Sequence, residues 1–372
     1  MKVDVVIIGG GIAGLSCAAF LDPAMDTVLL EAEATLGYHA TGRSAALYTE
    51  CYGNATISKL TQASSRYFAE HELTTCRGLL FVAKPNDEPA LDDLAIEYEP
   101  AVPDLLRMTP HAVEEMCPLF PAALVSGGLY EAGAKDIDVD ALQTSFVRAA
   151  RNLGVSILTT APVHGLEFTG DLWRITTDDG EYTTPIVVNA AGAWGDRIAS
   201  MGGVEPLGLR PLLRSVFTFD PGSDPQPWPM VVDAHENWYL KPTGPLLLGS
   251  AASELPSEPR DARADELDIA LGIEKVSAAT AAPIRSIKNT WAGLRTFAPD
   301  RTPAVGYDPH HRGFFWLVGQ GGYGIMTSPA LGALAASLIA DSMPPAALTE
   351  IGFTPSELDP ARLRSHQGLD SP

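Results

Sequence analysis

Features that define several classes of protein are scarce in this chain of 372 residues. Its four cysteines include no Cys-x-x-Cys pair, so we expect neither a disulfide framework nor a metal site. No uninterrupted apolar run reaches about 18 residues, so we expect no transmembrane segment. Basic residues are few, 25 against 46 acidic ones, and the formal net charge is −21. Such a charge repels nucleic-acid phosphates, and we expect no nucleic acid as a partner.

The beginning of the chain and its composition are typical of a soluble globular protein. Residues 1–4 lead directly into an apolar strand pattern, which leaves no room for a signal peptide. We therefore expect a cytoplasmic protein, at most loosely associated with a membrane. Apolar residues make up 46% of the chain and charged residues 19%, and the length allows two domains.

The strongest local pattern lies at the start of the chain. Residues 3–8 are rich in β-branched side chains and predict a strand buried on both faces of a parallel sheet. A G-x-G-x-x-G pattern follows at 9–14, then a predicted helix over 15–21, and Glu31 ends the next predicted strand. Such glycines let a pyrophosphate approach a helix N-terminus, and the acidic residue accepts hydrogen bonds from a ribose. The pattern predicts a dinucleotide site and leaves FAD and NAD as alternatives.

A second G-x-G-x-x-G pattern, at 319–324, lies between a predicted strand over 314–318 and a predicted helix over 328–340. Too little chain follows it for another complete dinucleotide unit. The pattern either places a helix N-terminus near negative charge on a bound ring system or marks a close backbone contact without a ligand.

The succession of predicted elements indicates two domains. The expected fold class is α/β, or α+β overall, with a Rossmann-like domain around a parallel sheet and a second, mainly antiparallel β domain for the substrate. The first domain is assembled from 1–77, 140–205 and 291–345, the second from 78–139 and 206–290, and 346–372 is expected to be a surface tail.

Four further motifs carry a resemblance to a known family. They are GYHATGRSAA at 37–46, NAAGAW at 189–194, WAGLR at 291–295 and QGGYG at 320–324. Together, and in this order over almost the whole chain, they resemble the FAD-dependent D-amino acid oxidase superfamily. Within it, the sequence is most similar to the bacterial D-arginine and D-amino acid dehydrogenases. The resemblance implies a two-domain fold that binds FAD non-covalently.

The resemblance also implies which residues contact FAD. The glycines of 9–14 and Glu31 would hold the ADP half, and residues 41–45 would follow the pyrophosphate towards the flavin. The implied set is Gly9, Gly11, Ile12, Ala13, Gly14, Glu31, Ala32, Thr41, Gly42, Arg43, Ser44, Ala45, Ala46, Val163, Ala191, Gly192, Trp194, Gly293, Arg295, Gly321, Gly322, Tyr323, Gly324, Ile325 and Met326.

The implied substrate site is built around arginine. Arg214, Tyr239 and Arg295 match the groups that hold a substrate carboxylate, and Tyr52 matches a tyrosine on a mobile loop that closes over the pocket. A guanidinium suits a carboxylate because its planar fork donates two parallel, charge-assisted hydrogen bonds. The implied pocket wall consists of Leu47, Thr49, Leu79, Gly322 and Met326.

Three positions of that wall depart from the D-arginine enzymes. Leu47, Leu79 and Met326 stand where those enzymes carry polar groups, including the carboxylate that holds a substrate guanidinium. A cationic side chain in an apolar pocket loses its hydration without compensation. The departures therefore favour substrates with neutral, apolar side chains.

The reaction that the resemblance implies is oxidative deamination of a D-amino acid. A hydride passes from the substrate Cα to flavin N5, the imino acid is hydrolysed to a 2-oxo acid and ammonia, and a quinone-like or other acceptor takes the electrons. The alternatives are an oxidase of the glycine or sarcosine type that uses O₂, and a 2-hydroxy acid dehydrogenase. An RNA-modifying flavoprotein is disfavoured by the acidic composition.

Overall fold

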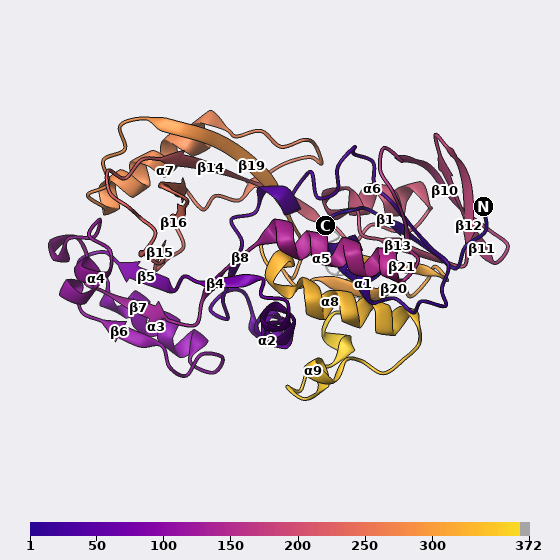
Figure 1. Cartoon of the computed structure of the whole chain (residues 1–372), viewed down its shortest axis with the longest axis horizontal. Helices are drawn as coiled ribbons and strands as arrows, with labels where there is room; N and C mark the ends of the chain where they lie inside the picture. The colour runs from indigo at the N-terminus through magenta and orange to yellow at the C-terminus, as the bar shows by residue number, and fades with distance from the viewer. Residues whose placement is uncertain (365–372) are drawn as a thin grey trace, which may run out of the picture.

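The computed structural model describes residues 1–364 and places them in two sheet-centred lobes (Figure 1). The first lobe contains a six-stranded sheet in the order β20-β21-β13-β1-β2-β9. The pairings are parallel except for β20 with β21. The strands are β1 (Val5–Ile8), β2 (Thr27–Leu30), β9 (Ser156–Leu158), β13 (Ile186–Asn189), β20 (Ala304–Tyr307) and β21 (Phe314–Val318). The predicted Rossmann-like parallel sheet is confirmed.

Helices cover this sheet closely. Helix α1 (Ile12–Phe20) packs against α5 (Val139–Asn152) and α8 (Gly324–Ile339), and α8 also packs against α2 (Ala55–Glu70). Helix α8 begins four residues before the predicted 328 and contains Pro329. Proline leaves the carbonyl of Ile325 without its helical donor, and the Ser328 hydroxyl donates to that carbonyl at 2.9 Å. The helix therefore continues through the proline.

The second lobe contains a nine-stranded sheet. Its order is β18-β14-β17-β16-β15-β5-β7-β6, with β19 on β14, and all pairings are antiparallel except β15 with β5. The mainly antiparallel character predicted for this part is confirmed. The strands are β5 (Leu79–Ala83), β6 (Leu106–Met108), β7 (Gly127–Glu131), β14 (Arg210–Phe219), β15 (Met230–Asp233), β16 (Tyr239–Thr243), β17 (Leu246–Ser250), β18 (Leu255–Pro256) and β19 (Ile287–Phe297).

Strand β19 crosses the boundary that we predicted between residues 290 and 291. It pairs with β14 from Phe297 opposite Arg210 to Ile287 opposite Phe219, so the chain changes lobes beyond this strand. On the second sheet, α7 (Glu266–Ala279) packs against β14 and β17, α3 (Glu88–Tyr98) against β5 and β7, and α4 (Pro110–Met116) against β6 and β7.

Two small sheets complete the described part of the chain. Strands β10 (Val163–Thr169), β11 (Leu172–Thr177) and β12 (Gly180–Thr184) form a meander beside α6 (Gly195–Met201) in the first lobe. Strands β3 (Leu47–Tyr48), β8 (Lys135–Ile137) and β4 (Thr74–Cys76) form a sheet between the two lobes (Figure 1). No helix within residues 1–364 is long and apolar enough to cross a membrane.

Residues 346–364 are packed onto the first lobe, although we expected a surface tail there. The segment contains α9 (Ala346–Thr349) and α10 (Ala361–Arg364). We expected a tail because the composition is polar and rich in proline. The segment nevertheless buries four apolar side chains, those of Leu348, Phe353, Leu358 and Leu363. The rest of the predicted tail, 365–372, lies outside the described residues.

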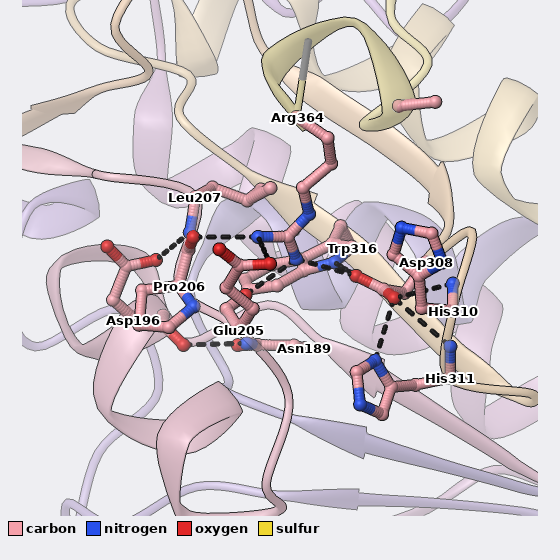
Figure 2. Close-up of polar contacts among 12 residues, drawn as sticks. Asn189, Asp196, Glu205, Pro206, Leu207, Asp308, His310, His311, Trp316 and Arg364 are labelled. Carbon is pink, nitrogen blue, oxygen red and sulfur yellow. Dashed lines mark hydrogen bonds and ion pairs between the residues drawn. The ribbon is translucent and has the colours of Figure 1, made fainter. Parts of the chain in front are cut away.

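A buried carboxylate holds the end of this segment (Figure 2). Asp308, fully buried in the turn before β21, accepts hydrogen bonds from Trp316 Nε1 at 3.0 Å and from Arg364 Nη2 at 2.8 Å. His311 Nδ1 lies 2.9 Å from the same carboxylate. Burial alone would raise the pKa of Asp308, but these donors lower it well below its usual range. Arg364 thus ties the last described helix to the edge of the parallel sheet.

Replacing Arg364 by alanine should lower the free energy of unfolding by about 2–3 kcal/mol, because a charge-assisted bond to a buried carboxylate is lost. Urea unfolding would measure the change. The matched control is Arg312→Ala, which removes an ion pair to Asp171 whose side chains are 79% and 83% exposed. That control should cost at most about 0.5 kcal/mol. Equal effects of the two variants would contradict the assigned role of Arg364.

Candidate functional site

Two adjoining cavities lie where the lobes meet. The larger has a volume of about 420 Å³ and extends along the N-terminal end of α1, and the smaller has a volume of about 100 Å³. Seven residues line both cavities, so they mark the junction: Ser44, Ala45, Arg214, Tyr239, Arg295, Gly322 and Ile325. In the described part of the chain, no cluster of three or more histidine, cysteine or acidic side chains is placed to hold a metal.

The glycines between β1 and α1 are glycines for different local reasons. Gly9 has a φ of +114°, which favours glycine, and a side chain there would also collide with the Ala190 carbonyl. A Cβ atom at Gly14 would collide with the Gly9 carbonyl, so this glycine serves the packing of α1 on the turn. Gly11 borders open space, with only Thr41 Oγ1 near a hypothetical Cβ, at 3.4 Å. The chain therefore leaves room for a ligand at the N-terminus of α1.

Glu31 lies at the end of β2, on the wall of the larger cavity. Its Oε2 atom accepts a hydrogen bond from the backbone N–H of Gly10 at 2.7 Å, and its Oε1 atom accepts one from Glu33 at 2.8 Å. The carboxylate is thus fixed beside the glycine turn, where the dinucleotide pattern places a ribose-binding acid.

The segment after α1 and β2 crosses between the lobes. Residues 41–43 form a short 3₁₀ helix, and the Arg43 guanidinium forms an ion pair with Asp261 and donates to the carbonyl of Ala262 at 2.6 Å. Arg43 lines the larger cavity, as predicted from the resemblance, but these partners in the second lobe hold its charged end. Arg43 therefore joins the two lobes across the cavity.

Lys241 fixes the next part of this segment. Its buried Nζ atom donates to the carbonyls of Ala45 and Ala46, the latter at 2.9 Å, and lies 2.9 Å from Asp136 Oδ1. Burial lowers the pKa of Lys241, and Asp136 opposes that shift. Ala46 has a φ of +27°, so these bonds hold a backbone turn that a non-glycine residue rarely adopts. We did not predict Lys241 from the sequence.

Most of the predicted cofactor residues line the larger cavity. These are Gly9, Gly11, Ile12, Ala13, Glu31, Ala32, Thr41, Arg43, Ser44, Ala45, Val163, Ala191, Gly192, Trp194, Gly293, Arg295, Gly321, Gly322, Gly324 and Ile325. Ala46 and Met326 line only the smaller cavity. Gly14, Gly42 and Tyr323 line neither: Gly42 packs on the Gly37 carbonyl, and the Tyr323 ring packs on Tyr52 and Phe297.

The second glycine turn reaches the junction of the cavities. Gly321 has a φ of +54°, and a side chain there would collide with the Phe297 ring. A Cβ atom at Gly322 would lie 2.6 Å from Tyr52 Oη and 3.0 Å from Arg295 Nη1. The absence of a side chain at Gly322 therefore lets Tyr52 and Arg295 approach this turn closely, and the positive end of α8 begins there.

Two arginines share one face of the antiparallel sheet. In the register of β14 and β19, Arg214 stands opposite Gly293, and Arg295 lies two residues further along β19. Side chains at this diagonal spacing project from the same face. Since Gly293 carries no side chain, both guanidinium groups reach the junction of the cavities.

The two guanidinium groups are like charges in a buried place. The Arg214 side chain is 12% exposed, and burial together with the charge of Arg295 lowers its pKa. Burial acts in the same direction on Arg295, but Tyr52, Tyr239 and Glu254 outweigh it and raise the pKa of that residue. Arginine stays charged at any physiological pH, so the pair presents two positive charges to a ligand.

Few partners compensate these charges. Arg214 donates to the carbonyls of Ser253 at 3.0 Å and Ala252 at 2.8 Å, and its Nη2 atom lies 3.6 Å from Glu254. Glu254 is engaged by Arg301 through two bonds of 2.9 and 2.8 Å. Glu254, the carboxylate 3.6 Å from Arg214, is therefore shared with Arg301, and the junction favours a bound anion.

The loop that contains Tyr52 is fixed at both ends in this structure. Tyr52 Oη accepts a hydrogen bond from Arg295 Nη1 at 2.9 Å. Thr49 donates to the buried carboxylate of Glu131, which also accepts from the backbone N–H of Glu50 at 3.1 Å. Burial raises the pKa of Glu131, and these donors oppose the shift. The Thr49 hydroxyl is thus committed to Glu131, although the residue lines the smaller cavity.

The remaining wall of the smaller cavity is largely apolar. Leu47, Leu79 and Met326 line it, together with Phe81, Met230 and Val232, which the sequence analysis did not identify. One further lining residue that we missed, Glu236, is acidic. Its neighbour His235 is exposed and lies 2.9 Å from Asp87. No pattern in the sequence indicates which residue of the turn before Tyr239 lines the cavity.

Residues 4–338 match the model of the DAO family, described as FAD-dependent oxidoreductases. The chain belongs to this family. Human mitochondrial dimethylglycine dehydrogenase is 26% identical over 411 residues, which cover 100% of this chain and 47% of that protein. Glycine oxidase of Bacillus subtilis is 25% identical over 365 residues, or 90% of this chain and 92% of the relative. The L-proline dehydrogenase structure from P. horikoshii superposes with a TM-score of 0.83, at 23% identity and 98% coverage of both chains.

These comparisons confirm the broad resemblance and leave the narrower one as a prediction. The relatives just named are dimethylglycine, glycine and proline enzymes rather than D-arginine dehydrogenases. The chain spans about half the length of the dimethylglycine dehydrogenases that it matches.

The cofactor of this oxidoreductase is FAD. Three features of the larger cavity fit it: the open space beside Gly11, the fixed carboxylate of Glu31, and a wall that continues to the two arginines. The ADP half would lie at the first two features, and the reactive ring would lie at the junction with the smaller cavity.

Replacing Gly11 by alanine should lower FAD content or affinity at least tenfold without lowering the stability of the apoprotein, because the added methyl group enters the cavity. Gly14→Ala is the matched control, and it should instead destabilise the fold, by about 2 kcal/mol or more, since its methyl group collides with the backbone. Visible absorbance after gel filtration and urea unfolding separate the two effects. Normal FAD binding by Gly11→Ala would contradict the cofactor position.

Proposed function

We propose that this oxidoreductase oxidises the C–N bond of a small amino acid, with or without a methyl group on the nitrogen. The observation that carries the proposal is the pair of buried guanidinium groups, Arg214 and Arg295, at the junction of the FAD cavity with a small second cavity. When bound, FAD supplies the acceptor for the hydride that leaves the substrate carbon.

The residues of the junction account for capture and orientation. Arg295 and Arg214 bind the substrate carboxylate through charge-assisted hydrogen bonds, which hold the adjacent carbon at the junction of the two cavities, which Gly322 also lines. Tyr52, already bonded to Arg295, covers this position and excludes water. Residues 44–46, held by Lys241, form the opposite wall.

The names of the relatives support the same chemistry. Besides its similarity to dimethylglycine dehydrogenase and glycine oxidase, the chain is 26% identical to 4-methylaminobutanoate oxidase of Paenarthrobacter nicotinovorans. The match covers 98% of this chain and 46% of that protein. These substrates share a carboxylate and an amine on a short carbon chain. The small volume of the second cavity fits a substrate of this kind.

D-amino acids with neutral, apolar side chains are the second candidate class. The observation that favours them is the wall of Leu47, Leu79 and Met326, all of which line the smaller cavity. An apolar side chain that packs against this wall contributes about 25 cal/mol of favourable binding free energy for each Å² of apolar surface that it buries. These D-amino acids would bind through the same two arginines as the small amino acids of the first class. They differ only in the side chain that contacts the apolar wall.

Anaerobic mixing of the yellow holoenzyme with a substrate panel tests the function. The panel contains glycine, sarcosine, dimethylglycine, D-Ala, D-Leu, D-Arg, L-Leu and lactate. We expect an N-methylated or unsubstituted small amino acid to bleach the flavin fastest, and D-Leu to do so if the second class is correct. Bleaching by lactate alone would contradict both proposals. Peroxide formation with O₂, compared with turnover with an artificial quinone, then identifies the electron acceptor.

Replacing Arg295 by methionine should lower kcat/KM for the best amino acid at least tenfold while FAD stays bound. The reason is that removing one partner of a buried charge-assisted pair costs about 2–5 kcal/mol. Arg197→Met is the matched control, because Arg197 pairs at 3.1 Å with an exposed glutamate and neither residue lines either cavity. An unchanged kcat/KM in the Arg295 variant would remove this residue from the substrate site.

A further inference from the structure

Glu236 places a carboxylate without a partner on the wall of the substrate cavity. It lies in the turn between β15 and β16, next to the strand that carries Tyr239. Among the described residues that line the smaller cavity, Glu236 is the sole acidic one. Within residues 1–364 its carboxylate has neither a hydrogen bond nor an ion pair. Most other lining residues are apolar and the remaining charged ones are the two arginines, so a ligand that enters the cavity can meet a free carboxylate there.

The backbone at Glu236 is held in a conformation that suits glycine or asparagine better. Its φ is +54°, in the left-handed region that few other residues adopt. The turn is fixed by Asp233, whose carbonyl accepts from the Glu236 N–H at 2.7 Å and whose carboxylate accepts from Asn237 at 2.8 Å. Backbone strain of the kind that a positive φ imposes on Glu236 is found disproportionately at functional sites. Nothing in the turn itself requires a glutamate at this position.

The charges around Glu236 are distributed across the cavity. Glu236 is an exposed residue, but partial burial of its carboxylate raises its pKa, and Arg214 and Arg295 oppose this shift because they favour the ionised form. Glu97 and Glu254 also raise the pKa of Glu236. The lining therefore includes two positive charges at the FAD junction and one negative charge that lines the smaller cavity alone. A zwitterion, with its carboxylate and its ammonium separated by a short chain, matches this pattern.

We propose that Glu236 binds the positively charged nitrogen of the incoming substrate and so restricts capture to amino acids, to the exclusion of carboxylates that lack an amine. The inference rests on the proposed function and deepens it, because it assigns the residue that would separate amino acids from 2-hydroxy acids. The arginines alone bind any small carboxylate. Glu236 adds a charge that favours an ammonium and disfavours a second negative group.

The test compares Glu236→Gln with the wild-type holoenzyme, using the visible spectrum of bound FAD under anaerobic conditions. Two probes are compared: sarcosine, which carries both charges, and acetate, which carries only the carboxylate. Acetate is titrated at equilibrium, whereas the affinity for sarcosine, a proposed substrate, is taken from the concentration dependence of the bleaching rate after rapid mixing, or from the titration if no bleaching occurs. We expect sarcosine to bind about 10- to 100-fold more weakly to the variant, since a charge-assisted bond is lost, and acetate to bind equally or more tightly. Glu99→Gln, which removes an exposed carboxylate outside the cavity wall, is the matched control and should change neither affinity.

A second variant, Glu236→Gly, covers the case in which the glutamine variant does not fold. Glycine adopts a positive φ without strain, so its Tm should equal or exceed that of the wild type. Its loss of sarcosine affinity should match that of Glu236→Gln. A purely structural role for Glu236 would lower the Tm and weaken both probes alike.

The outcomes separate this inference from the function on which it rests. Unchanged sarcosine affinity in both variants, or equal weakening of sarcosine and acetate, overturns the role of Glu236 while the function stands. If no amino acid of the panel bleaches the wild-type flavin, the proposed function fails. The binding titration then still decides the inference, because a wild-type protein that binds acetate and not sarcosine overturns it as well.

Discussion

The repulsion between two buried guanidinium groups is the constraint around which this protein is organised. Arg214 and Arg295 project from the same face of neighbouring strands, and their partners among the described residues are the shared carboxylate of Glu254, two backbone carbonyls and the Tyr52 hydroxyl. These partners do not fully compensate two buried positive charges, so the pair favours an anion between the lobes. Gly293, opposite Arg214, carries no side chain, and both arginines line the junction of the two cavities.

The path of the chain follows from the need to place the two arginines beside the dinucleotide site. The parallel sheet provides a helix N-terminus for a dinucleotide, and the antiparallel sheet provides the long strands that carry the arginines. Neither sheet contains the site by itself. The chain therefore passes repeatedly between the lobes, and charged side chains hold the crossing segments. Arg43 reaches from the first lobe to residues 261–262, and Lys241 reaches back to residues 45–46.

Local patterns in the sequence were sufficient to predict the parts of the site that depend on short-range order. The glycine turn at 9–14 lies between one strand and one helix, and Glu31 directly follows the next strand, so spacing alone places them. Local patterns did not bring the two arginines together. They were assigned to one site only through the family resemblance, because no short-range pattern relates residue 214 to residue 295. Their common face depends on the register of two strands that are far apart in the sequence.

The residues that were missed depend on contacts between distant segments. Glu236 faces the cavity because of the geometry of one turn, and Lys241 is buried because Asp136 and two carbonyls of another segment meet it. Residues 346–364 were assigned to a tail because their composition is polar. Their four buried apolar side chains lie five residues apart, and this spacing matches neither the period of a helix nor that of a strand.

A crystal structure of the holoenzyme soaked with acetate tests the central claim most directly. The account predicts the FAD pyrophosphate beside Gly11, the reactive ring at the junction of the cavities, and the acetate carboxylate bonded to both Arg214 and Arg295. Acetate bound elsewhere, with the two guanidinium groups bridged by a side chain of the protein itself, would contradict it.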